Sequence, residues 1–220
     1  MPCTAALVSG GPDSAVLVWT LARRGTRVVP IYIRQGLRWE AAEQYWLRRW
    51  LAVFPPRGPQ SGGGVAPLVT LTAPAADRAR GHWSVTGVGV PGAAAPDAAV
   101  ELPGRNLVLV TTAAVYCAAR RISRIALGTL KGNPFADATP LFRRALGRAL
   151  TLGLGRPIAV EAPLASIPKA QVLRRAAQWR LPLGLTFSCI NPRGRAPCGR
   201  CQKCEERRRG FRQAGLHDVV

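Results

Sequence analysis

The sequence predicts an α/β fold in which helices cover both faces of a parallel sheet. Three observations support this prediction. Short apolar segments alternate with segments of helical period, a glycine-rich turn follows the first apolar segment, and 48% of the 220 residues are hydrophobic. Alternating strands and helices are typical of parallel sheets, and this hydrophobic content is enough for a sizeable core.

The first four elements follow a strand–helix–strand–helix order. Residues 5–9 form a short apolar run that stops at two glycines, and a helical pattern then runs from residue 14 to Gly25. Residues 27–33 (RVVPIYI) are rich in β-forming side chains, and the helical pattern of residues 39–54 stops at two prolines. The 3.6-residue period and these stop signals identify the helices.

The second half of the chain repeats this alternation. We expect a largely apolar, buried helix, followed by a strand, a helix, a strand and a helix. These elements span residues 106–119, 124–128, 142–152, 157–161 and 168–179. Together with the first four elements they predict a Rossmann-like sheet with helices on both faces.

An irregular region, residues 55–104, separates the two halves. Pro, Gly and Ala dominate it, and one short strand at 66–71 interrupts it. A loop of this length in a compact domain is usually functional or disordered, so an active-site lid and a flexible segment both remain open. We expect an α/β domain over residues 1–185 and a small C-terminal segment over residues 186–220.

The chain is strongly basic, with 31 Lys and Arg, 11 Asp and Glu, and a net charge of +20. Only Lys131, Lys169 and Lys203 are lysines. Two interpretations stay open: a surface that contacts nucleic acid without sequence specificity, and biased codon usage that enriches Arg together with Ala, Gly and Pro. No apolar run is long enough to span a membrane, and the N-terminus lacks a signal-peptide pattern, so we expect a cytoplasmic protein.

The first chemical motif is SGGPDS, in the turn between the first strand and the first helix. Its glycines let the backbone approach an anion closely, and the amides at the helix start favour phosphate. A carboxylate beside phosphates suggests Mg²⁺; the alternative is a plain turn with Asp13 as helix cap. The Walker pattern GxxxxGK[ST] is absent. The candidate ATP ligands in this motif are Ser9, Gly10, Gly11, Asp13 and Ser14.

The second motif groups four of the six cysteines near the C-terminus: Cys189, Cys198, Cys201 and Cys204. In a cytoplasmic chain, clustered cysteines favour a metal, and four thiolates with CxxC spacing can enclose one Zn²⁺. Because four thiolates leave no open coordination position, we expect a structural zinc site that supplies folding energy to a short segment. An iron–sulfur cluster and a redox-active cysteine pair are the alternatives.

SGGPDS resembles the PP-loop of the ATP pyrophosphatases, which attach AMP to a substrate oxygen and release pyrophosphate. Followed by the cysteine cluster, it resembles the 7-cyano-7-deazaguanine synthase (QueC) family. The resemblance covers residues 5–211, apart from the middle loop. Further matching segments are YIRQGLRWE at 32–40, PGRN at 103–106, ALG at 126–128, PL at 163–164, KA at 169–170 and LTFSC at 185–189.

The resemblance implies a PP-loop fold and an ATP-dependent ligase that forms C–N bonds. A carboxylate on a 7-deazaguanine would attack the ATP α-phosphate, and ammonia would then displace AMP to give an amide and finally a nitrile. The implied cofactors are ATP, Mg²⁺ and structural Zn²⁺. The candidate catalytic residues are Asp13, Lys169 and Arg105; Gly128 joins the ATP ligands; and the candidate substrate ligands are Asp137, Gln35 and Asn106.

The sequence departs from the family at the base pocket. Where the family commonly carries PDCR, this chain has ADAT, which keeps Asp137 but places Ala138 and Thr139 at the Cys and Arg positions. Leu37 stands where the family has a histidine. Two further functions therefore stay open: a divergent ligase, for instance of a bacterial defence system, that joins the acyl group to a protein or another amine, and a PP-loop protein that binds or modifies RNA. A homodimer is open as well.

Overall fold

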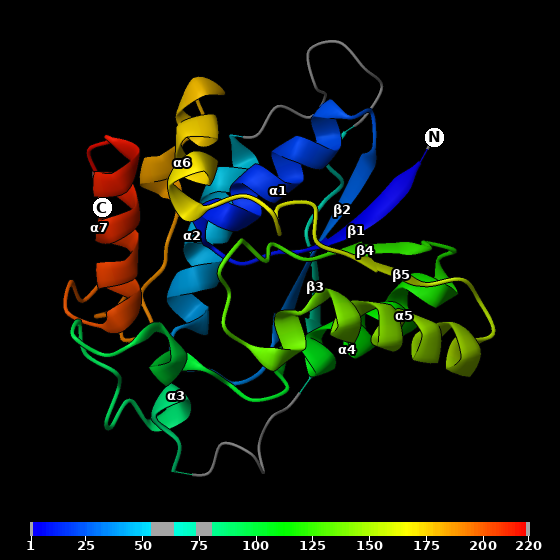
Figure 1. Cartoon of the computed structure of the whole chain (residues 1–220), viewed down its shortest axis with the longest axis horizontal. Coiled ribbons are helices and arrows are strands. Elements are labelled where there is room, and N and C mark those ends of the chain that lie inside the picture. The colour runs from blue at the N-terminus through cyan, green and yellow to red at the C-terminus, as the bar shows by residue number, and fades with distance from the viewer. Residues whose placement is uncertain (1, 54–63, 74–80, 219–220) are drawn as a thin grey trace.

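The computed structural model describes residues 2–53, 64–73 and 81–218. They contain a five-stranded sheet in which all strands run parallel, in the order β3-β2-β1-β4-β5 (Figure 1). The strands are β1 (Cys3–Leu7), β2 (Arg27–Arg34), β3 (Val69–Thr72), β4 (Arg124–Ala126) and β5 (Ala159–Glu161). The predicted parallel α/β sheet is confirmed, with strand ends that differ from the predicted ones by a few residues.

Every long helix of the prediction is present. The helices are α1 (Pro12–Arg23), α2 (Glu40–Ala52), α3 (Trp83–Thr86), α4 (Arg105–Ala119), α5 (Pro140–Leu154), α6 (Lys169–Gln178) and α7 (Gln202–Ala214). The sequence does not indicate α3 or the 3-10 turn at Asp97–Val100, because elements of four residues carry too little periodicity. Within the described ranges, no helix combines the length and the apolar character needed to cross a membrane.

Alternate residues of the central strands face different helical layers. Ala6 and Tyr32 pack with residues of α1, α2 and α6, whereas Ala5 and Ile31 pack with residues of α4 and α5. This two-residue alternation is expected for strands that are buried on both faces. In Figure 1, α1, α2 and α6 accordingly lie on one side of the sheet and α4 and α5 on the other. Helices on both faces are therefore confirmed.

Helix α4 is less buried than its composition predicts. It carries no charged residue after Arg105, and a helix that is apolar all round is normally buried. Its outer face nevertheless leaves Leu107 45% and Val115 58% exposed. The prediction of a buried helix is thus wrong for one face, because α4 lies in an outer layer and reaches the sheet through a single stripe. That stripe comprises Val110, Ala113, Ala114 and Cys117.

The C-terminal segment packs directly against the α/β domain. Its cysteines share a hydrophobic cluster with Trp39 and with Trp83 of the middle region. The rings of Trp39 and Trp83 stack with centroids 6.0 Å apart. The Phe187 backbone N–H donates to the Gly10 carbonyl (2.7 Å), which ties the segment to the SGGPDS loop. The proposed boundary between residues 185 and 186 stays a prediction.

Residues 81–104 of the irregular region are held by the start of α7. The Gln202 backbone N–H donates to the Pro91 carbonyl (2.9 Å), and its side-chain amide donates to Asp97 (2.7 Å). Arg209 of α7 also pairs with Asp97, at 2.8 Å. The predicted lid falls partly on residues 54–63 and 74–80, which lie outside the described residues, so it stays a prediction.

Candidate active site

The SGGPDS loop lies where the order of the strands reverses. β1 and β4 are neighbours at the centre of the sheet, with β2 beside β1 and β5 beside β4. The chain after β1 forms the loop, and Gly128 follows β4. In open parallel sheets, ligands bind at the carboxyl ends of the strands at such a reversal. A cavity of about 270 Å³ lies there, and Ser9, Asp13 and Gly128 are among its lining residues.

The two serines organise the loop. The Ser9 N–H donates to Ser14 Oγ (2.9 Å), the two hydroxyl oxygens lie 3.0 Å apart, and the Gly11 N–H donates to Ser9 Oγ (3.1 Å). A Cβ atom on Gly10 would lie 3.0 Å from the Glu43 carbonyl oxygen, so this position needs glycine. Gly11 is the N-cap of α1 and no side chain caps the helix. The alternative of a turn capped by Asp13 is therefore wrong.

Asp13 has a protein partner that the sequence analysis missed. The Lys169 ammonium lies 2.8 and 2.7 Å from the two carboxylate oxygens of Asp13, although the residues are 156 positions apart. The side chains of Lys169 and Asp13 are 20% and 28% exposed. Lys169 is the first residue of α6, and the fold brings it to the start of α1. The pair therefore places a cation beside the phosphate loop, where the sequence shows no nearby lysine.

All three lysines of the chain line a second cavity, of about 260 Å³, next to the first. Asp13 and Gly128 line both cavities. Lys203 forms an ion pair with Glu206 one helical turn along α7. The spacing of the lysines in the sequence does not indicate this convergence, because it depends on how α6, α7 and the loop after β4 pack together.

Three predicted site residues meet at the N-terminus of α4. Asp137 accepts hydrogen bonds from the Asn106 backbone N–H (2.8 Å) and from its side-chain amide (3.1 Å), and both residues line the first cavity together with Arg105. The Arg105 Nε donates to Gln35 Oε1 (3.1 Å). Gln35 is 4% exposed and is not among the cavity-lining residues, so it reaches the cavity through Arg105.

Tyr32 and Glu43, which the sequence analysis missed, also line the first cavity. The buried Tyr32 hydroxyl donates to Glu43 Oε2 (2.7 Å), and the backbone of Gly10 lies against the Glu43 side chain. Burial raises the pKa of Glu43 and of Tyr32 above their usual values. One signal was available in the sequence: Glu43 falls on the same helical face as Leu47 and Trp50, where a carboxylate is rare unless it has partners.

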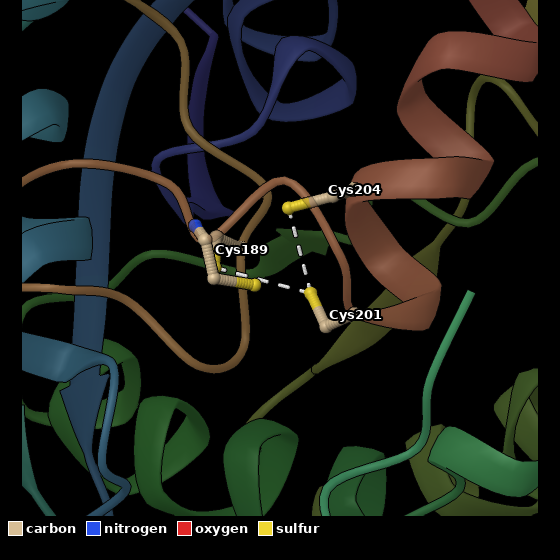
Figure 2. A group of neighbouring side chains, drawn as sticks. Cys189, Cys201 and Cys204 are labelled. Atoms are coloured by element: carbon tan, nitrogen blue, oxygen red, sulfur yellow. Dashed lines mark hydrogen bonds between the residues drawn. The ribbon is translucent and has the colours of Figure 1, made fainter.

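The four clustered cysteines converge as predicted. Their Sγ atoms all lie within 4.8 Å of one another. The Cys201 Sγ lies 3.9 Å from that of Cys189 and 3.5 Å from that of Cys204 (Figure 2). Zn–S bonds of about 2.3 Å in a tetrahedron place the sulfurs about 3.8 Å apart. The cluster therefore fits a single tetrahedral ion and could bind zinc.

The surroundings of the cysteines also suit a metal. The backbone N–H groups of Asn191 and Cys198 each donate to the Cys189 Sγ at 3.3 Å, as outer partners of metal ligands commonly do. Hydrogen bonding with the Cys201 and Cys204 thiols, together with burial, raises the pKa of Cys189. Metal ligation needs ionised thiolates, and a cation at the centre of the four sulfurs would stabilise them in that form.

Comparison with known proteins gives one consistent result. The family model "Queuosine biosynthesis protein QueC" matches residues 83–215. The 7-cyano-7-deazaguanine synthase of Azoarcus sp. (strain BH72) is 30% identical over 99% of this chain and 96% of its own. The 7-cyano-7-deazaguanine synthase 1 of Desulfitobacterium hafniense (strain Y51) is 29% identical over 96% of this chain and 91% of its own.

Other similarities are narrower. The 7-cyano-7-deazaguanine synthase of Anaeromyxobacter sp. (strain Fw109-5) is 34% identical, and the match spans about half of each chain, 53%. Among solved structures, a predicted subunit of tRNA methyltransferase from Methanocaldococcus jannaschii has a TM-score of 0.48 at 17% identity, over 80% of this chain and 75% of that chain.

The family match contains the cysteine cluster and Asp137, and the alignment with the Azoarcus relative covers almost the whole chain, including the SGGPDS loop. The model spans more than half of the 220 residues. The resemblance of the two motifs is thus confirmed by matches along the chain, and the protein belongs to the QueC family.

Proposed function

We propose that this protein activates the carboxylate of a 7-deazaguanine with ATP and passes the acyl group to ammonia, giving an amide and then a nitrile. The observation that carries the proposal is the SGGPDS loop with the Asp13–Lys169 pair at the switch point of the sheet. Family membership supports the same activity, because the relatives compared above are named 7-cyano-7-deazaguanine synthases.

In the adenylation step, a substrate carboxylate oxygen forms a bond to the ATP α-phosphorus, and the bond to the bridging oxygen breaks. Charge develops on the departing pyrophosphate. Backbone N–H groups at the start of α1 and the Lys169 ammonium would stabilise that charge. Asp13 would hold Mg²⁺ beside the phosphates, and the ion would neutralise further charge. No covalent enzyme intermediate is needed, so catalysis rests on positioning and electrostatics.

The cysteine cluster would hold Zn²⁺ as a structural ion, because four thiolates leave no open position for a substrate. Its place between the SGGPDS loop and α7 suggests that the ion fixes the C-terminal segment against the active site. A cytoplasmic location, a homodimer, a protein acceptor and nucleic-acid contact stay predictions. The names of the relatives favour ammonia as the acceptor over the two alternative functions.

We expect ATP to be cleaved between its α- and β-phosphates. Purified protein with ATP and 7-carboxy-7-deazaguanine should release AMP and pyrophosphate, and mass analysis with ammonia should show the amide and the nitrile. Each nitrile should require two AMP. Release of ADP and phosphate would contradict the PP-loop assignment. A product that stops at an acyl conjugate, with one AMP per turnover, would favour the divergent ligase.

We expect Asp137→Asn to raise the substrate KM by about 10- to 100-fold, the usual value of hydrogen bonds to a charged group. A guanine-like edge offers two N–H donors, and a carboxylate can accept both, whereas an asparagine presents a donor on one side. Both oxygens of Asp137 already accept a hydrogen bond from Asn106. Each oxygen keeps a further lone pair that can accept from the substrate. Initial rates against substrate concentration provide the measurement.

Thr139→Ala is the matched control for damage to this loop. Thr139 Oγ1 caps α5 by accepting from the Phe142 N–H (3.2 Å), so its loss should cost about 1 kcal/mol of stability while leaving the Asp137 carboxylate intact. It should lower the melting temperature with little change in KM. If Asp137→Asn and wild type have equal KM values, the deazaguanine ring binds elsewhere.

A further inference from the structure

The first cavity is lined by three carboxylates: Asp13, Glu43 and Asp137. Asp13 is paired with the Lys169 ammonium through both oxygens. Asp137 receives two N–H donors from Asn106 and anchors the start of α4. Both carboxylates are therefore already engaged, one by a cation and the other by two N–H donors. Glu43 differs, because its partners among the described residues are neutral.

Glu43 is 8% exposed and comes from α2. The Tyr32 hydroxyl of β2 donates to its carboxylate, and Gly10 of the SGGPDS loop lies against its side chain. The other charged groups that face it are Glu40 of α2 and Arg105 of α4. Glu43 is thus a buried carboxylate at the wall of the first cavity, fixed by the Tyr32 hydrogen bond and without a direct ion pair among these groups.

The proposed function leaves one proton without an acceptor. When ammonia attacks the acyl-adenylate, its lone pair forms the C–N bond, and AMP departs with the electron pair of the C–O bond. The nitrogen must then lose a proton to become an amide. A general base near the operating pH makes this transfer efficient. Apart from the carboxylates, the ionisable groups that line the first cavity are Tyr32 and Arg105, and Tyr32 keeps its proton because burial raises its pKa.

We propose that Glu43 is the proton acceptor of the C–N bond-forming step, and this proposal rests on the proposed function. Its carboxylate takes the proton that the attacking nitrogen loses and releases it to solvent after the product leaves. Burial raises the pKa of Glu43 toward neutral pH, and this makes the carboxylate a stronger base. The contact between Gly10 and Glu43 places the base beside the SGGPDS loop.

The test separates adenylation from acyl transfer in the variant Glu43→Gln. Glutamine has the same shape, and its side-chain amide can donate to the Tyr32 oxygen, so this contact can be kept. Substrate-dependent exchange of pyrophosphate into ATP reports adenylation alone and should stay within about threefold of wild type. Amide formation from ammonia should fall by about 10²- to 10⁴-fold, the usual contribution of a general base.

The pH dependence of amide formation provides a second measurement, which would not change if Glu43 had only a structural role. In wild type, amide formation at saturating ammonia should fall as pH drops through the raised pKa of Glu43, since the protonated group cannot accept a proton. Glu43→Gln should lose this acid limb. Tyr32→Phe removes a hydrogen bond that lowers the pKa of Glu43 and should move the limb to higher pH. Hydroxylamine is largely unprotonated at neutral pH, so as the amine it should show the same acid limb in wild type and separate this limb from the titration of ammonium.

Each outcome decides between the proposals. Absence of substrate-dependent exchange in wild type would overturn the proposed function itself. Wild-type exchange together with undiminished amide formation in Glu43→Gln would overturn the role of Glu43 and leave the function standing. Equal loss of exchange and amide formation, with an unchanged melting temperature, would assign Glu43 to ATP binding instead and overturn the proton-acceptor role.

Discussion

Replacing Asp13 by Asn should lower substrate-dependent pyrophosphate exchange by about 10³-fold. This is the upper end of the rate loss seen when an enzyme loses one group that stabilises developing charge. The asparagine keeps the shape but removes the negative charge that fixes the Lys169 ammonium at 2.7 Å. It also removes the carboxylate that would hold Mg²⁺. Both changes act on the departing pyrophosphate, so the adenylation step should suffer first. Exchange of labelled pyrophosphate into ATP at saturating ATP is the measurement.

The fold should survive this substitution. The Asp13–Lys169 pair is 28% and 20% exposed, and a pair that solvent reaches contributes about 1 kcal/mol or less. Lys169→Ala should give a similar loss of exchange, and the double variant should be no worse than either single one, because groups that act as a unit are not additive. Glu161→Gln, which breaks the exposed pair with Arg124 outside both cavities, is the control. Additive losses would show that Asp13 and Lys169 act separately.

Local patterns explain why so much of the fold could be predicted. The strand at residues 27–33 and the helix at residues 39–54 each carry their own period and stop signals, and the two motifs specify backbone and ligand chemistry within a few residues. The parallel direction of the strands then follows from the alternation of strands and helices. The same logic places SGGPDS at the carboxyl end of β1 without any knowledge of its contacts.

Contacts between distant elements could not be predicted. The pairing of Asp13 with Lys169 depends on how α6 packs against α1, and nothing in either local sequence encodes it. The exposure of Val115 on α4 depends on whether another layer covers that helix. Glu43 is the intermediate case, because its position on a buried helical face was visible in the sequence, but its partner Tyr32 was not. Local motifs therefore identified single site residues such as Asp13 and Asp137, but not the partners that the fold brings to them from distant parts of the chain.

Replacing Cys201 by Ser should abolish stoichiometric zinc and unfold the C-terminal segment. We expect one zinc per chain in the wild-type protein and a value near zero in the variant, measured by metal analysis after purification. Apparent binding free energies of structural zinc are about 10 kcal/mol or more, comparable to the whole stability of a domain. Cys201 stands at the start of α7 and its Sγ lies within 3.9 Å of two other cysteine sulfurs, so its loss leaves three of the four thiolates.

Cys117→Ser is the matched control, because Cys117 is fully buried in α4 and lies outside the cluster. Burial raises the pKa of the Cys117 thiol to about 12, so it stays protonated and does not ligate a metal. Its replacement should cost only the burial of a hydroxyl, about 1–3 kcal/mol, with the zinc content unchanged. Adding a chelator should lower the melting temperature of wild type and of Cys117→Ser alike, but should not affect Cys201→Ser. If Cys201→Ser keeps its zinc, or if wild type contains iron with visible absorbance, the four cysteines do not form a structural zinc site.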